Sequence, residues 1–164
     1  MSFFLPLLPT DTKEAATLEA YRIKLEVFTP EVVSVMGRQL IERYLLLSQE
    51  DLHLWENNPE EFAIEEGGEA WKYSLRPCTE CLFLSLFHEH QAVLTPMLIG
   101  MLNNSMDLIP PNDMSRIIKR DALYNAIGLA AFELFDEVDF DGWFSQVMFL
   151  LLLLLSNVNN LMTI

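Results

Sequence analysis

Residues 51–90 read DLHLWENNPEEFAIEEGGEAWKYSLRPCTECLFLSLFHEH, and the two halves of this stretch have opposite character. The first half is acidic. Eight acidic residues and no Lys or Arg fall between Glu50 and Glu69, so this segment repels itself and attracts basic partners. The second half is apolar on more than one side, as in a helix sandwiched between neighbouring helices. The stretch therefore predicts an exposed acidic connector followed by a buried helix.

Helix signals repeat on both sides of this stretch. Thr29-Pro30 and Thr95-Pro96 each place a capping residue before a proline at the first helical position. Ser74 is the expected cap of the apolar helix, and Pro77 then falls in the first turn, where its missing N–H does no harm. The apolar spacing and these signals together predict helices over residues 12–28, 30–47, 49–57, 75–90, 96–102, 113–135 and 141–155.

The order of these elements predicts an all-α fold. No segment alternates apolar and polar residues with period two between turn signals, so no sheet is expected. The helices pair through short turns at about 40 residues per pair, which is typical of an α-solenoid of antiparallel helix pairs, of HEAT or armadillo type. Within it, the helices over 12–28 and 30–47 are expected to be antiparallel neighbours, since only a residue or two separates them.

The last twenty residues differ from the rest. Residues 150–155 are six consecutive leucines, and a polar stretch follows them. A leucine run of this kind has no polar face, so it must be buried, self-associate or aggregate. We therefore expect helical-repeat solenoid over residues 1–144 and a divergent leucine-rich C-terminal tail over residues 145–164.

Composition and charge narrow the class of partner. The chain has 164 residues, a formal net charge of −14 and a pI near 4.4. Nucleic acid and anionic membrane surfaces would be repelled, and no run reaches the ~18–20 apolar residues of a membrane-spanning helix. Two cysteines favour a reducing compartment. A basic protein partner fits the charge best, although an acidic surface can also serve only solubility.

The residues that could carry chemistry do not form a recognisable catalytic or metal motif. Cys78 and Cys81 have the spacing of half a zinc site, with His88 and His90 behind them. On one continuous helix, however, His88 and His90 lie about 200° apart, so a single helix cannot close that site. No nucleophile elbow, Gly-rich phosphate loop or H-E-x-x-H pair is present. We therefore expect no enzyme activity and no cofactor.

Several segments resemble a known family. Trp55 followed by NPEEF at 58–62, then WKYSLRPCTE at 71–80 and RDALYNAIGLAAFELFDEVDFDGWF at 120–144, resembles the interior helical repeats of the importin-beta (karyopherin) family. Within that family the sequence is most similar to the importin eleven subgroup. The resemblance extends from about residue 5 to about residue 144, and the chain departs from the family pattern from about residue 145.

The resemblance implies a function that the residue patterns alone do not. A family member binds cargo protein in the cytosol, passes through nuclear pores by contact with nuclear pore proteins, and releases cargo when the GTPase Ran binds in its GTP form. The implied location is the cytoplasm and nucleus, including the nuclear envelope and pore. The family's N-terminal, Ran-contacting repeats have no counterpart here, so the chain alone is expected to be a weak carrier. The alternative is a small stand-alone helical adaptor that binds a basic protein without a transport cycle.

The acidic connector supplies the candidate binding residues. Its acidic residues lack the alternating spacing of the oxygen ligands in an EF-hand calcium loop. The connector could instead bind a Lys/Arg-rich protein, or it could be a solvated turn with no partner. Trp55 could anchor a partner, although core packing is expected to account for at least two of Trp55, Trp71 and Trp143. The candidate partner-binding residues are Trp55, Glu60, Glu61, Glu65, Glu66 and Glu69.

Overall fold

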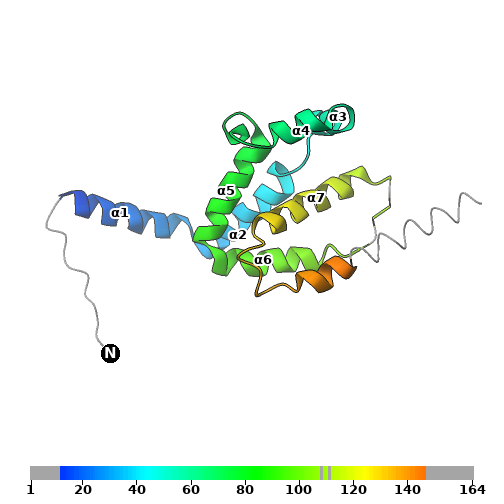
Figure 1. Cartoon of the computed structure of the whole chain (residues 1–164). Coiled ribbons are helices and arrows are strands. Elements are labelled where there is room, and N and C mark those ends of the chain that lie inside the picture. Colours follow the sequence, from blue (N-terminus) through cyan, green and yellow to red (C-terminus); the bar gives the residue numbers. More distant parts are fainter. Residues whose placement is uncertain (1–11, 108, 111, 147–164) are drawn as a thin grey trace, which may run out of the picture.

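The computed structural model describes residues 12–107, 109–110 and 112–146, and every regular element within these ranges is helical (Figure 1). The all-α prediction is confirmed for this part of the chain. Residues 140–146 are also helical. The elements are α1 (Thr12–Val27), α2 (Pro30–Gln39), the π-helical turn η1 (Leu40–Tyr44), α3 (Gln49–Asn57), α4 (Pro59–Glu65), the 3-10 turn η2 (Ala70–Lys72), α5 (Leu75–Glu89), α6 (Gln91–Asn103) and α7 (Met114–Leu129).

One hydrophobic core is shared by α2, η1, α5, α6 and α7, which meet at the centre of Figure 1. The apolar half of the opening stretch contributes Phe83 and Phe87 from α5, as expected for a helix between other helices. Their rings lie 5.9 Å apart between centroids. The largest fully buried side chains are Phe83, Phe87, Ile41, Leu45, Leu94, Leu98, Leu134 and Val33.

The helix expected over residues 30–47 begins where predicted but ends differently. Thr29 caps it, since its Oγ1 accepts the backbone N–H of Val32 at 3.4 Å. At the other end the N–H of Leu45 donates to the carbonyl of Leu40 at 2.9 Å, the i to i+5 bond of a π turn. The extra residue rotates the following side chains, so Ile41 and Leu45 are buried. Tyr44, which the regular 3.6-residue period places on the core face, is 46% exposed.

Helix α6 begins earlier than the sequence indicates. It starts at Gln91, so Pro96 lies inside the helix instead of opening it, and the expected range 96–102 is wrong at its start. A proline inside a helix removes one backbone hydrogen bond. Burial of Leu94, Met97 and Leu98 on the same helix offsets that loss.

A glycine lies at the contact between α2 and α6. A Cβ at Gly37 would lie 2.6 Å from Cδ2 of Leu94, so the Leu94 side chain would have to shift to accommodate it. The absent side chain lets the two helices approach closely in the core.

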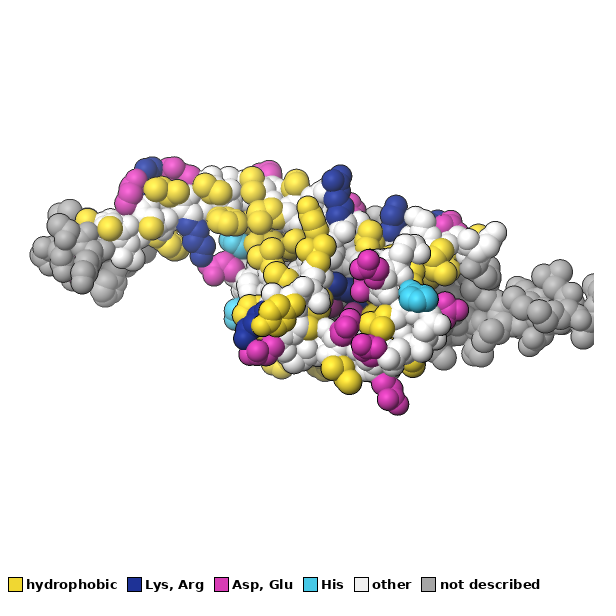
Figure 2. All heavy atoms as spheres, turned by 90° about the horizontal axis from the view of Figure 1, so that it is seen from above, with side chains coloured by type: hydrophobic (Ala, Val, Ile, Leu, Met, Phe, Trp, Pro, Cys, Tyr) yellow, Lys and Arg dark blue, Asp and Glu magenta, His cyan; other side chains and the backbone are white. Residues whose placement is uncertain are grey.

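Helix α1 does not fold back on α2, so the expected antiparallel pair is wrong. A chain reversal needs a longer turn, and only Phe28 and the extended Thr29 separate the two helices. The apolar side chains of α1 are consequently exposed, and Figure 2 shows them along the helix where it extends from the body. Lys24 of α1 forms an ion pair with Glu89, and Phe28, the residue that follows α1, stacks on His90.

The helix expected over residues 113–135 ends at Leu129. Successive turns follow it, in which the N–H of Leu134 donates to the carbonyl of Ala130 at 3.0 Å. These turns keep both side chains in the core but expose Phe132. The predicted leucine-rich tail falls outside the described residues apart from 145 and 146, which are helical.

Candidate protein-binding site

The acidic connector forms a helical hairpin, α3 and α4, where the sequence indicated one short helix and a loop. A reciprocal capping box starts α3. The N–H of Asp51 donates to Oγ of Ser48 at 3.1 Å, and the N–H of Ser48 donates to Oδ2 of Asp51 at 2.7 Å. Asn58 then ends α3 and caps α4, accepting the N–H of Glu61 at 3.3 Å with Pro59 at the first helical position. This Asn-Pro-Glu-Glu start signal is present in the sequence and could have indicated α4, which apolar spacing alone misses.

The hairpin brings most of the candidate residues onto one outer surface. Trp55 lies on α3 and is 61% exposed, while Glu60, Glu61 and Glu65 are exposed on α4. Figure 2 looks down on this hairpin and shows acidic side chains gathered there. The expectation that at least two tryptophans are core residues is wrong, because Trp71 is exposed like Trp55 and Trp143 alone packs against the core.

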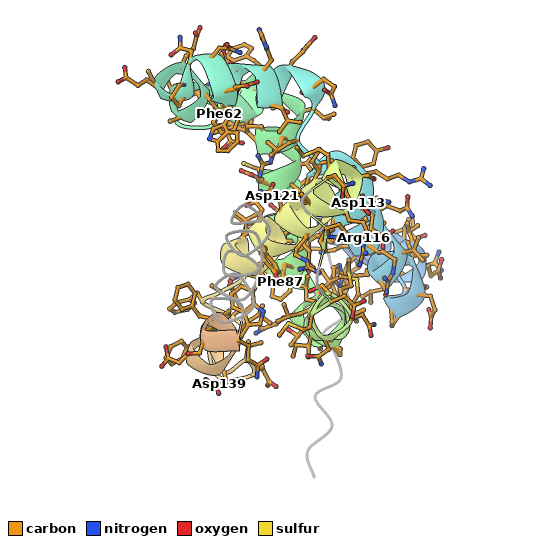
Figure 3. The ribbon with its side chains drawn as sticks, turned by 90° about the vertical axis from the view of Figure 1, so that its right-hand side faces the viewer. Phe62, Phe87, Asp113, Arg116, Asp121 and Asp139 are labelled. Atoms are coloured by element: carbon orange, nitrogen blue, oxygen red, sulfur yellow. The ribbon has the colours of Figure 1, made fainter. Side chains whose placement is uncertain are left out.

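A cleft of about 970 Å³ lies beneath the hairpin, between α3, α4, the end of η1 and the start of α5. We call it the acidic cleft, because four carboxylates and only two Arg side chains line it. Phe62 reaches from α4 toward α5 and forms part of its apolar wall (Figure 3). The charged residues of its lining are Glu50, Asp51, Glu65, Glu66, Arg43 and Arg76.

Arg76 joins the acidic cleft to the core helices. Its side chain is only 12% exposed, and Nη1 donates to Glu66 Oε1 at 2.7 Å while Nη2 donates to Asp121 Oδ2 at 3.3 Å. Its Nε lies 3.8 Å from Glu80 Oε1, which also accepts Nδ2 of Asn125 at 2.6 Å. One guanidinium therefore holds together carboxylates that follow α4, lie on α5 and lie on α7.

The negative charge of Glu66 is unfavourable in this network. Burial raises the pKa of its carboxyl above the ordinary value, and the Arg76 guanidinium, which lowers this pKa, does not cancel the effect. Glu80, Asp51 and Asp121 raise the pKa further, since all three are negative. A carboxyl with a raised folded-state pKa stabilises the fold below its unfolded pKa, and this contribution is lost as the pH rises through the folded pKa.

We therefore expect Glu66→Gln to stabilise the protein slightly at pH 7. The amide keeps a hydrogen-bond acceptor for Arg76 without the buried charge, so the melting temperature rises by about 1–2 °C. At pH 4 the difference from the parent protein is expected to shrink, because the raised pKa favours the protonated, uncharged form of Glu66. Thermal melts by circular dichroism at both pH values check this. A lower melting temperature of the variant at pH 7 would show that the Arg76 ion pair outweighs burial.

The network divides the candidate residues into two groups. Glu66 is neutralised by Arg76, and Glu69 pairs with Lys72 at 2.6 Å. Glu60 and Glu65 have no ion pair among the described residues, and Glu61 accepts a hydrogen bond from Asn58 Nδ2 at 2.6 Å. The charge available to an external partner therefore lies on α4, not on the turn that follows it.

The cysteines and histidines do not converge. Cys78 and Cys81 are free, exposed thiols, and Nδ1 of His88 lies 3.5 Å from Oε1 of Glu133. Within the described ranges, no three His, Cys, Asp or Glu side chains are grouped so that they could hold a metal ion. None of the described helices is long and apolar enough to cross a membrane.

Comparisons with known proteins agree with the helical architecture. No family model matches the chain. Importin-11 of Mus musculus is 51% identical over 129 residues, covering 78% of this chain, and Importin-11 of Homo sapiens is 50% identical over 131 residues, covering 79%. Importin beta-like protein KAP120 of Saccharomyces cerevisiae is 29% identical over 126 residues, covering 77%.

A solved structure supports the same architecture. The S. cerevisiae protein Lph2, titled a novel bidirectional nuclear transport receptor, aligns with a TM-score of 0.67 and 26% identity over 81% of this chain. The predicted class, an α-solenoid of helical repeats, is confirmed by this match. The chain spans about an eighth of each of these relatives: 13% of both Importin-11 sequences and of Lph2, and 12% of KAP120.

Proposed function

We propose, from the sequence similarity that places this chain in the importin-beta family, that it forms a segment of a nuclear transport receptor and presents a cargo-binding surface. The segment extends over residues 1–144 in this proposal. Identity near 50% to Importin-11 over more than three quarters of the chain supports this function. A stand-alone adaptor is not favoured, because the similarity continues from the acidic hairpin through the core helices and is not confined to one binding motif.

The transport cycle belongs to the whole receptor. Cargo, Ran in its GTP form and nuclear pore proteins are the partners we propose for it, and movement between cytoplasm and nucleus through the pore is the location we propose. None of these binding events needs catalytic chemistry, so we propose no enzyme activity for this segment.

The exposed acidic face of α4 is the surface that we propose binds cargo. Glu60, Glu61 and Glu65 share seven residues of helix, and none of them is neutralised by a Lys or Arg of the described chain. Charge attraction to a Lys/Arg-rich cargo segment would speed encounter and weaken with salt. Trp55 lies on the neighbouring helix with most of its surface exposed, where it can cover the aliphatic part of a bound Lys or Arg.

A binding experiment tests this proposal. A fluorescein-labelled peptide of about eight alternating Lys and Arg residues is titrated with the full chain, and fluorescence anisotropy reports binding. The triple variant Glu60→Gln, Glu61→Gln, Glu65→Gln is expected to raise the Kd about tenfold at ~0.15 M salt, because it removes three charges from the contact. Trp55→Ala is expected to weaken binding by less.

The matched control changes the same number of charges on another exposed helix. Glu14, Glu19 and Glu26 lie on α1, and their replacement by Gln alters the net charge equally. If the α1 triple variant weakens binding as much as the α4 variant, the attraction comes from net charge alone and α4 is not a specific site.

A further inference from the structure

A second concave surface has the opposite charge. It is a groove of about 770 Å³ between α2 with η1, α6 and α7. The whole chain has ten Lys and Arg residues, and half of them line this groove, although the protein is strongly acidic overall. We call it the basic groove. Its basic side chains are Arg38 from α2, Arg43 from η1, and Arg116, Lys119 and Arg120 from α7.

The positive charge of the basic groove is only partly neutralised within the chain. Arg38 lies 3.6 Å from Glu42, and both are about half exposed. Asp107 faces two of the α7 side chains: its carboxylate lies 4.0 Å from Arg116, and its carbonyl accepts a hydrogen bond from Arg120.

Three of the basic residues, Arg43, Lys119 and Arg120, have no ion pair within the described ranges. Asp113 is also near the start of α7, as Figure 3 shows, and its carboxylate accepts the backbone N–H of Arg116. Five cations thus meet two carboxylates, Glu42 and Asp107, at the groove, and Asp113 is engaged by the helix backbone.

The floor of the basic groove is apolar. Ile41, Met97 and Leu123 are core residues whose side chains also line it. Gly100 lies at the same surface, and a Cβ built there meets nothing within 4 Å, so the groove has open space above α6. An occupant therefore needs apolar side chains for the floor and negative groups for the rim.

We propose that the basic groove binds an acidic amphipathic peptide segment of a partner protein. Leu-like side chains of this segment would rest on the floor from α6, and Glu or Asp side chains would pair with α7 and η1. Nucleic acid fits less well for two reasons. The groove lining contains no aromatic side chain for base stacking. A longer polyanion would also extend beyond the groove over a protein of net charge −14.

This proposal does not rest on the transport function, and it assigns a second partner chemistry. The acidic face of α4 would take a basic segment, and the basic groove an acidic one. The two surfaces meet at Arg43, which lines both the groove and the acidic cleft.

The test uses the full chain and a fluorescein-labelled peptide of about fifteen residues, with Leu at helical spacing flanked by Glu. Fluorescence anisotropy gives its Kd at ~0.15 M salt, where charges more than about 8 Å away are screened. The double variant Arg116→Gln, Lys119→Gln is expected to weaken binding about tenfold. Arg22→Gln, Lys24→Gln on α1 removes the same charge elsewhere and is expected to leave the Kd unchanged.

A steric variant tests the groove without changing its charge. Gly100→Phe puts a large side chain into the open space above α6 and is expected to weaken peptide binding at least tenfold. Gly128→Phe is the matched control, because Gly128 is also helical and open but does not line the groove. Circular dichroism confirms that both variants keep the helical content of the parent.

Four outcomes would overturn the proposal. One is equal weakening by Gly100→Phe and Gly128→Phe. Another is unchanged binding when the leucines of the peptide become serines, since the floor would then contribute nothing. The third is tighter binding of a fluorescein-labelled single-stranded oligonucleotide that is lost in the α7 double variant, which would make the groove a nucleic-acid site. Self-association that the peptide abolishes, seen by sedimentation, would instead identify a second copy of the chain as the occupant and contradict a separate partner.

Discussion

Replacing Phe87 with alanine is expected to lower the free energy of unfolding by about 3–5 kcal/mol. The ring is 1% exposed and packs against Phe83, at the position where α5 meets the other core helices (Figure 3). The substitution removes the transfer free energy of the ring and leaves a cavity that close-packed neighbours cannot fill. For a total stability of about 5–15 kcal/mol this is a large fraction. Urea unfolding followed by circular dichroism measures it, with the slope of the transition unchanged.

Phe132→Ala is the matched control for this prediction. The same atoms are removed from a side chain that is 91% exposed, in the turns after α7. A change within about 0.5 kcal/mol is expected there. Similar losses for the two variants would mean that Phe87 is not a core residue in solution, or that the Phe132 face is buried by association.

The local signals in the sequence were sufficient for most helices. Thr29 caps the helix it was expected to cap, Ser74 occupies the expected N-cap position of α5 without a side-chain hydrogen bond, and the apolar density of residues 75–90 correctly indicated a buried helix. These features depend on residues within one turn of each other, so they can be read from the chain directly. The exposed position of the α4 carboxylates also followed from local acidity. The exposure of both Trp55 and Trp71 did not, because core packing was expected for at least two of the three tryptophans.

The errors occurred where distant contacts decide the structure. Pro96 lies inside α6 because burial of Leu94, Met97 and Leu98 on the same helix outweighs one lost hydrogen bond. The π turn at Leu40 rotates the end of α2 by one residue, which no spacing rule anticipates. Helix α1 has an apolar stripe, but the described residues provide no partner helix for it, so amphipathicity alone did not predict packing.

The arrangement of the two proposed binding surfaces could not be predicted from the sequence either. Arg76 and Asp121 are 45 residues apart, and their contact requires α5 and α7 to be adjacent. The basic groove combines cations from α2, η1 and α7 that are scattered singly through an acidic sequence. The net charge of the chain indicated an acidic surface but not the local basic groove. A net charge is summed over all residues, so it does not show where the positive side chains lie.

Replacing Arg76 with methionine is expected to lower the free energy of unfolding by about 2 kcal/mol at pH 7. Methionine keeps the length of the apolar stem but leaves Glu66, Glu80 and Asp121 facing one another without a cation. Removing one partner from a buried ion pair costs about 3–5 kcal/mol. The expected loss of stability is smaller here because the three carboxylates are a quarter to nearly half exposed and solvent screens them.

The pH dependence distinguishes this mechanism from simple loss of packing. Without Arg76 the neighbouring carboxylates repel one another, and the pKa of Glu66 loses the one cause that lowers it. The cost of this repulsion is present at high pH and relieved as the pH falls. The difference between Arg76→Met and the parent should therefore shrink between pH 7 and pH 4.

Double-mutant and control variants complete the test of Arg76. In urea unfolding at pH 7, adding Glu66→Gln to Arg76→Met should restore part of the lost stability, because one of the three uncompensated charges is removed. Arg22→Met, at an exposed position on α1, should leave the unfolding midpoint unchanged. A loss at Arg76 that is the same at both pH values, and that Glu66→Gln does not relieve, would mean that the aliphatic stem and not the guanidinium joins the acidic cleft to the core.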